Sequence, residues 1–179
     1  MKFQDIPQFA GGGGYEVNVP LDQLIDTMKR YQDEYGLILE PDFQRGHVWN
    51  INQRIKYMEY FLQGGKSGLI IYLNQPSWQS NKQFSYDEFV LVDGLQRLTT
   101  LIMFMNNNLE IFGNNKLSDF TDKIRMSSAN FNLRINVNNL KTKKEVLTWY
   151  LEMNSGGTPH TESELNKVKD LIINLDIIH

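Results

Sequence analysis

In the middle of the chain, a run of apolar residues passes directly into a helical pattern. Phe89 to Val92 form a short, continuous apolar run, which is typical of a strand buried on both faces. Asp93 and Gly94 follow, and beyond them apolar residues recur at a helical period: Leu95, Leu98, Ile102, Met105 and Leu109. A buried strand followed at once by a helix indicates an α/β architecture.

The remaining patterns predict a mixed sheet flanked by helices. Strands are expected at residues 15–19, 69–73, 89–92 and 131–137, and helices at 21–35, 51–62, 95–109, 141–153 and 162–175. Gly11 to Gly14 cannot hold one conformation cheaply, so residues 1–14 are expected to form a flexible leader. With 179 residues the chain has the length of one domain, which we place at 15–179.

Composition and charge exclude several classes of function. The formal charge of −3 argues against a dominating basic surface for non-specific nucleic-acid binding, although a local basic cleft is compatible with it. The absence of cysteine excludes disulfides, thiolate zinc sites, iron–sulfur clusters and cysteine nucleophiles. No segment approaches the ~18 continuous apolar residues of a membrane span, so we expect no membrane partner and a cytoplasmic location.

The junction at Asp93 and Gly94 is the first candidate site. A helix N-terminus presents unpaired amides and the positive end of its dipole, so Gln96 and Arg97 lie where a phosphate would be held. Asp93 would hold a Mg²⁺ ion that bridges to this phosphate. The alternative, which spacing alone leaves open, is that Asp93 caps the helix and Arg97 is a solvated surface charge.

The segment from Pro41 to Trp49 is the second candidate, because it also runs into a predicted helix start. Gln44 and Arg45, beside Phe43 and Trp49, can orient a base or a phosphate while the aromatic rings fix the loop. The alternative is that the two aromatic residues anchor the core and that Arg45 bonds loop carbonyls.

Three other features have simpler explanations. Residues 64–67, GGKS, resemble the end of a P-loop, but they run from a predicted helix to a strand, the reverse of that motif. His47 has no second ligand or orienting carboxylate at a recognisable spacing, which favours a structural role. Arg54 and Lys56 lie on an aromatic helix, where the acidic overall charge favours a solvated face.

The two candidate segments contain motifs that occur together in one family. The first, Pro-x-Phe/Tyr-Gln-Arg-x-x-x-Trp, is present at residues 41–49, and the second, Asp-Gly-Gln-Gln-Arg-Leu-Thr-Thr-Leu, is present at residues 93–101 with Leu95 in place of its first glutamine. A weaker third element is the stretch Asn154 to Gly157 before Glu164-Leu165. Over residues 15–175 the chain therefore closely resembles the N-terminal domain of GmrSD-type restriction endonucleases, also called domain of unknown function 262.

This resemblance implies a ParB/sulfiredoxin-like fold whose Asp-Gly-x-Gln-Arg loop binds and hydrolyses nucleoside triphosphates in proteins that defend against phage DNA. The residues it implies for nucleotide or phosphate binding are Gln44, Arg45, Gly94, Arg97 and Asn154. Asp93, Gln96 and Arg97 are the implied catalytic residues, with Asp93 also the ligand of Mg²⁺. The family couples this domain to a separate HNH nuclease domain, whose pattern the three histidines His47, His160 and His179 do not form.

Two hypotheses of function result. One is a stand-alone, Mg²⁺-dependent nucleoside triphosphatase. The other is a non-catalytic phage or mobile-element module that binds DNA or a host defence protein, and Leu95 favours it; the sequence leaves open whether the domain forms a homo-oligomer. Direct nuclease activity ranks third, because only Asp93, together with Asp42 or Glu40, would supply the clustered carboxylates it needs.

The motifs also predict geometry. Asp93 should lie at the end of a strand, with Gln96 and Arg97 in the first turn of the following helix. Arg45 and Arg97 should line one cleft, and at least one of them should pair with Asp93 or Asp42, because unpaired arginines in a cleft repel each other.

Overall fold

The computed structural model describes residues 14–78, 84–121, 131–154 and 162–177. The predicted leader at residues 1–14 lies outside this range except for Gly14. Ser155, Gly156 and Gly157 of the third motif lie outside the described residues as well.

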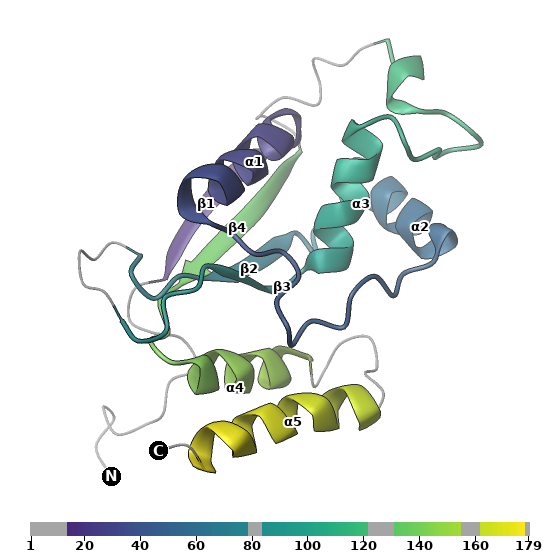
Figure 1. The fold of residues 1–179 in the computed structure, drawn as a ribbon. Coiled ribbons are helices and arrows are strands. Elements are labelled where there is room, and N and C mark those ends of the chain that lie inside the picture. The colour runs from purple at the N-terminus through teal and green to yellow at the C-terminus, as the bar shows by residue number, and fades with distance from the viewer. Residues whose placement is uncertain (1–13, 79–83, 122–130, 155–161, 178–179) are drawn as a thin grey trace.

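Four strands form one mixed sheet in the described part of the chain (Figure 1). The antiparallel pairs are β1 (Tyr15–Pro20) with β4 (Asn132–Asn138) and β2 (Ile70–Asn74) with β3 (Val90–Asp93). β2 and β4 pair parallel, so the order across the sheet is β1-β4-β2-β3. Together with the helices, this sheet confirms the predicted mixed α/β class. The ParB/sulfiredoxin-like assignment stays a prediction.

The helices follow the predicted positions closely. They are α1 (Leu24–Tyr35), α2 (Ile51–Leu62), α3 (Leu95–Met105), α4 (Lys143–Asn154) and α5 (Glu162–Ile177), with short 3₁₀ turns at η2 (Leu21–Gln23) and η3 (Leu117–Asp119). None of the helices in the described residues is long and apolar enough to cross a membrane.

Local hydrogen bonds and backbone angles explain where α2 begins and where α3 ends. The Asn50 side chain accepts a hydrogen bond from the Gln53 amide at 3.0 Å, and the Gln53 side chain accepts one from the Asn50 amide at 2.9 Å, which forms a capping box. The helix predicted to extend to Leu109 ends at Met105 instead, because Asn107 has a φ of 63°, which a right-handed helix cannot include. Leu109 still reaches the core and is 1% exposed.

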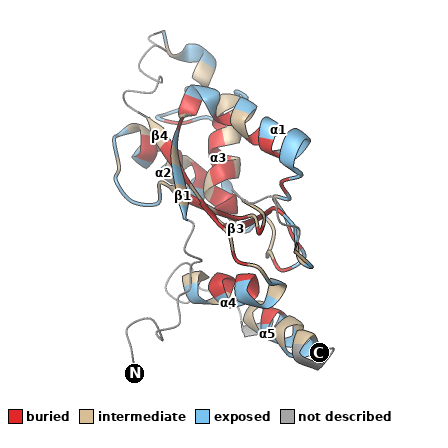
Figure 2. Ribbon diagram, turned by 90° about the vertical axis from the view of Figure 1, so that its left-hand side faces the viewer, coloured by how far each residue is buried: buried red, intermediate tan, exposed pale blue. Residues whose placement is uncertain are grey.

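The helices cover the sheet in two layers (Figures 1 and 2). α1, α2 and α3 pack on one face, around a core that includes Leu91, Leu98 and Ile135. α4 and α5 cover the other face beside β2 and β3, around a second core that includes Val90 and Val92. Alternate residues of β3 therefore enter different cores, which confirms that this strand is buried on both faces.

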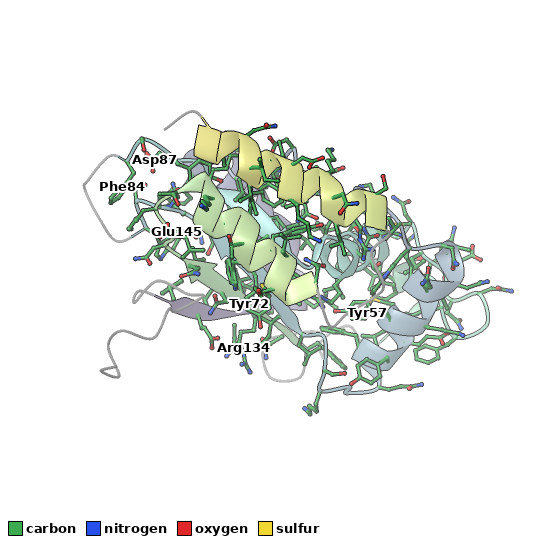
Figure 3. The ribbon with its side chains drawn as sticks, turned by 90° about the horizontal axis from the view of Figure 1, so that it is seen from below. Tyr57, Tyr72, Phe84, Asp87, Arg134 and Glu145 are labelled. Carbon is green, nitrogen blue, oxygen red and sulfur yellow. The ribbon has the colours of Figure 1, made fainter. Side chains whose placement is uncertain are left out.

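Aromatic contacts fix α4 against the sheet. The ring centroids of Trp149 and Tyr72 of β2 lie 5.9 Å apart, edge to face, and Figure 3 shows Tyr72 beneath α4. One residue further along, the ring centroid of Tyr150 lies 5.3 Å from that of Phe43 of the first motif. These contacts bring the last turn of α4 to the loop that precedes α2.

Replacing Leu98 tests the core between the sheet and helices α1, α2 and α3, which is the larger of the two cores. Leu98 is 0% exposed on α3, so Leu98→Ala is expected to lower the free energy of unfolding by about 2 to 5 kcal/mol through lost burial and a cavity. Chemical denaturation would measure the change. Glu34→Ala, on the exposed side of α1, is the control and should stay within about 0.5 kcal/mol of wild type. An equally small change in Leu98→Ala would contradict the position of α3 in this core.

Candidate functional site

The candidate site begins where β3 becomes α3. β3 ends at Asp93 and α3 begins at Leu95, which places Gln96 and Arg97 in the first helical turn, as predicted. Gly94 links the two elements with a φ of 108°, and a Cβ atom there would lie 2.4 Å from Cδ1 of Ile71. Glycine is therefore required at this turn, and it supplies no side chain to cap the positively polarised first turn of α3.

Two glutamines, one from each motif, link the loop before α2 to the β3–α3 segment. The Nε2 group of Gln44 donates hydrogen bonds to the carbonyls of Leu91 and Val92, both at 3.0 Å. Gln96 does the reverse: its Oε1 accepts from the amides of Val48 and Trp49, each at 3.2 Å, and its Nε2 donates to the Gly46 carbonyl at 2.6 Å. We call these five bonds the glutamine clamp. It holds the loop before α2 against the junction of β3 and α3.

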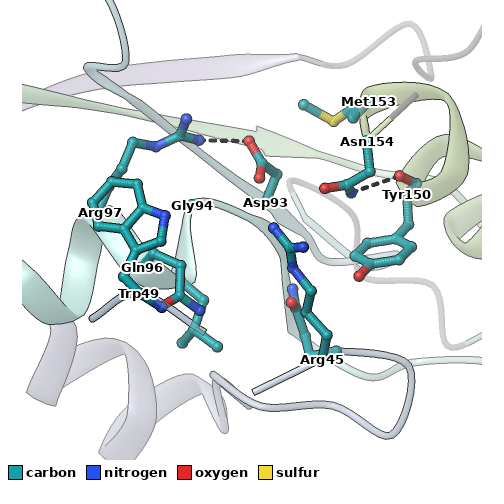
Figure 4. Close-up of a pocket in the computed structure, with 11 residues that line it drawn as sticks. Arg45, Trp49, Asp93, Gly94, Gln96, Arg97, Tyr150, Met153 and Asn154 are labelled. Atoms are coloured by element: carbon teal, nitrogen blue, oxygen red, sulfur yellow. Dashed lines mark hydrogen bonds and ion pairs between the residues drawn. The ribbon is translucent and has the colours of Figure 1, made fainter. Parts of the chain in front are cut away.

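The two motifs and the end of α4 enclose a pocket of about 160 Å³ (Figure 4). Its lining residues are Gln44, Arg45, Trp49, Asp93, Gly94, Leu95, Gln96, Arg97, Tyr150, Met153 and Asn154. Arg45 and Arg97 thus line one cleft, as predicted. All seven candidate residues named from the sequence are among its walls.

Arg97 and Asp93 form an ion pair inside this pocket. Their Nη2 and Oδ2 atoms lie 2.5 Å apart, and the two side chains are 22% and 29% exposed. The pairing of an arginine with Asp93 is therefore confirmed. The Nε atom of Arg97 is buried, and no hydrogen-bond acceptor among the described residues meets it. A buried donor without an acceptor is destabilising.

The end of α4 supplies two residues that the motifs did not indicate, Tyr150 and Met153. Tyr150 is 3% exposed, and burial raises the pKa of its hydroxyl to about 12, although the Arg45 guanidinium acts in the opposite direction. The hydroxyl is therefore protonated at neutral pH and can donate a hydrogen bond. Nδ2 of Asn154 donates to the Tyr150 carbonyl at 2.8 Å, which fixes the end of the helix.

The carboxylates needed for direct nuclease activity do not gather here. Asp93 is the one carboxylate among the described residues that line the pocket. Asp42 pairs with Lys143 at 2.7 Å, and Glu40 lies 3.2 Å from His47, outside the pocket in both cases. Within the described ranges, no group of three or more His, Asp or Glu side chains is arranged to hold a metal ion.

The prediction that Arg54 lies on a solvated helix face is wrong, because the residue is buried. It is 7% exposed, and its Nη1 donates to the Thr99 and Thr100 hydroxyls at 3.0 and 3.2 Å. Burial lowers the pKa of Arg54, but an arginine stays charged at neutral pH. The two threonines of the second motif therefore link α3 to α2, and the helix face that carries Arg54 is an interface.

Removing the Gln96 amide tests the glutamine clamp. Gln96→Ala leaves two amides and a carbonyl without their partner, so it is expected to lower the free energy of unfolding by about 2 to 4 kcal/mol. Amide hydrogen exchange at Val48 and Trp49 should accelerate. Gln53→Ala is the matched control, because that glutamine also accepts from a backbone amide but lies exposed in a helix cap, and about 1 kcal/mol is expected. Unchanged exchange at Val48 and Trp49 in Gln96→Ala would show that the clamp does not hold the loop.

Comparison with known proteins agrees with these two motifs. The family model described as GmrSD restriction endonuclease, N-terminal domain, matches residues 22–132, which is more than half of the chain and includes both motifs. Neither the curated proteins nor the solved structures gave a match. α4 and α5 lie beyond the matched residues. Its two motifs and the extent of this match show that the chain belongs to the family of GmrSD restriction endonuclease N-terminal domains and is related to the restriction proteins of phage defence.

Proposed function

We propose that this domain binds a nucleoside triphosphate through its phosphates in the pocket between Arg45 and Arg97, and hydrolyses it. The observation that carries the proposal is the convergence of two arginines and the uncapped start of α3 on one pocket. Guanidinium groups bind phosphate oxygens in pairs, and the positive end of a helix dipole favours an anion. One carboxylate against two arginines leaves the pocket side chains with a net positive charge.

The size of the pocket supports binding by the phosphates. Sites that enclose a whole small ligand usually measure ~300–1,000 Å³. At about 160 Å³ this pocket encloses only part of a nucleotide, and the remainder would lie against its walls.

The ion pair between Arg97 and Asp93 supports a specific order of events. A phosphate that binds Arg97 replaces the Asp93 carboxylate as its partner and leaves Asp93 available beside the phosphate. Mg²⁺ is commonly held by one or two carboxylates, water and substrate phosphates, so Asp93 is the residue that would hold it here, where the ion would neutralise phosphate charge. Asp93 would also orient a water molecule for attack. Gln44 and Gln96 act as positioning residues in this proposal, because their amides hold the two arginine-bearing segments together.

A second candidate function is a binding module without turnover that acts on DNA or on a host defence protein. Leu95 favours it, because the side chain that replaces the family glutamine is 4% exposed and joins the larger core. Binding of a nucleotide without release of phosphate would support this candidate over the enzyme.

Replacing Arg97 tests phosphate binding. Arg97→Ala is expected to weaken nucleotide binding about 10- to 150-fold, because a charge-assisted hydrogen bond contributes about 1.5 to 3 kcal/mol. Isothermal titration with ATP, GTP, CTP and UTP would measure the affinity, with a melting curve for each variant. Arg134→Ala is the control, because Arg134 also faces a carboxylate, Glu16 at 3.9 Å, but lies outside this pocket. Equal affinity in Arg97→Ala and wild type would remove Arg97 from the site.

Replacing Asp93 tests the exchange of partners at Arg97. Without Mg²⁺, Asp93→Asn is expected to bind tripolyphosphate about five-fold more tightly, because a partly exposed ion pair worth up to about 1 kcal/mol no longer competes. With Mg²⁺, the same variant should release no phosphate from ATP. Asp42→Asn removes a carboxylate that pairs with Lys143 outside the pocket and should match wild type in both assays. Weaker Mg²⁺-free binding by Asp93→Asn would refute the exchange.

A further inference from the structure

Some walls of the pocket lie within the residues that the family model matches, and others lie beyond them. Arg45, Asp93 and Arg97 lie within residues 22–132, which the family model matches, whereas Tyr150, Met153 and Asn154 lie beyond it on α4. The wall with Arg45, Asp93 and Arg97 therefore lies within the matched residues, and the wall formed by α4 lies outside them.

The two helices that reach the pocket present opposite ends of their dipoles. α3 begins at the pocket, with the positive end of its dipole, and α4 ends there at Asn154, with the negative end (Figures 1 and 4). By their dipoles alone, α3 favours a phosphate group and α4 favours an uncharged part of a ligand.

The α4 side chains suit such a group. The Tyr150 ring is fixed on Phe43, with its centroid 5.3 Å away, and the hydroxyl stays protonated because burial raises its pKa to about 12. Met153 presents a partly buried thioether, a side chain that packs well against flat rings. Asn154 carries an amide with both donor and acceptor groups.

We propose that Tyr150, Met153 and Asn154 contact the nucleoside of the bound nucleotide, so that α4 determines which nucleoside triphosphates the domain accepts. This inference rests on the proposed function, because it requires that the phosphates occupy the wall formed by Arg45 and Arg97. In Figure 4 these three α4 residues lie together on one side of the pocket and Arg97 lies on the other.

The experiment compares nucleotides with a ligand that has no nucleoside. Isothermal titration of the full chain with ATP, GTP, CTP, UTP and tripolyphosphate would be run on wild type, Arg97→Ala, Met153→Ala and Tyr150→Phe. Met153→Ala and Tyr150→Phe are expected to weaken the preferred nucleotide about 3- to 10-fold while tripolyphosphate affinity changes less than about 2-fold. Arg97→Ala should weaken all five ligands. Thr148→Ala, an exposed position on α4 outside the pocket, is the control for effects on the helix itself.

Each outcome separates the two proposals. If Met153→Ala and Tyr150→Phe leave the differences between nucleotides unchanged, or weaken tripolyphosphate equally, α4 does not contact the nucleoside, while the proposed function stands. If wild type binds neither nucleotides nor tripolyphosphate, both proposals are wrong. Melting curves for the two α4 variants close to that of Thr148→Ala would show that lost affinity does not reflect unfolding.

Discussion

The candidate site depends on reciprocal hydrogen bonds between two segments that are far apart in the sequence. Gln44 donates to the last carbonyls of β3, and Gln96, three residues after Asp93, holds the backbone at Gly46, Val48 and Trp49. Each glutamine bonds backbone groups of the other segment, and buried polar groups require such partners. Because the bonds run in both directions, neither segment can move without breaking bonds to the other. The two arginines share a pocket as a consequence.

The pocket neutralises part of its own positive charge in the resting state. Two arginines in one cleft would repel each other, and Asp93 neutralises one of them through a partly buried ion pair. The opposed dipoles of α3 and α4 polarise the pocket from one wall to the other. A ligand with a polyanionic end and an uncharged end matches this polarity, and a nucleotide has that form.

Local sequence patterns predict most of the helices and strands. The roles of residues within the site depend instead on contacts between residues that are distant in the sequence. The burial of β3 and the start of α3 could be predicted because both depend on neighbouring residues. The end of α3 could not, since hydrophobic spacing does not reveal the left-handed Asn107. The catalytic role of Gln96 stays a prediction, and its hydrogen-bond partners lie in a distant loop that spacing does not reveal. Arg54 is likewise buried through hydrogen bonds to two threonines of another helix, a contact that its own helix pattern does not reveal. Helical spacing indicates Tyr150 as a neighbour of Asn154, because it lies four residues before Asn154 on α4.

Binding of an anion at the start of α3, between Arg45 and Arg97, can be tested by an amide NMR titration of the wild-type protein with ATP and Mg²⁺. The largest saturable shifts are expected at the amides of Gly94 to Arg97. The competing location is the larger pocket of about 480 Å³, whose basic residues are Lys66 and Arg134. Largest shifts around that pocket, or no saturable shifts at the start of α3, would contradict the account.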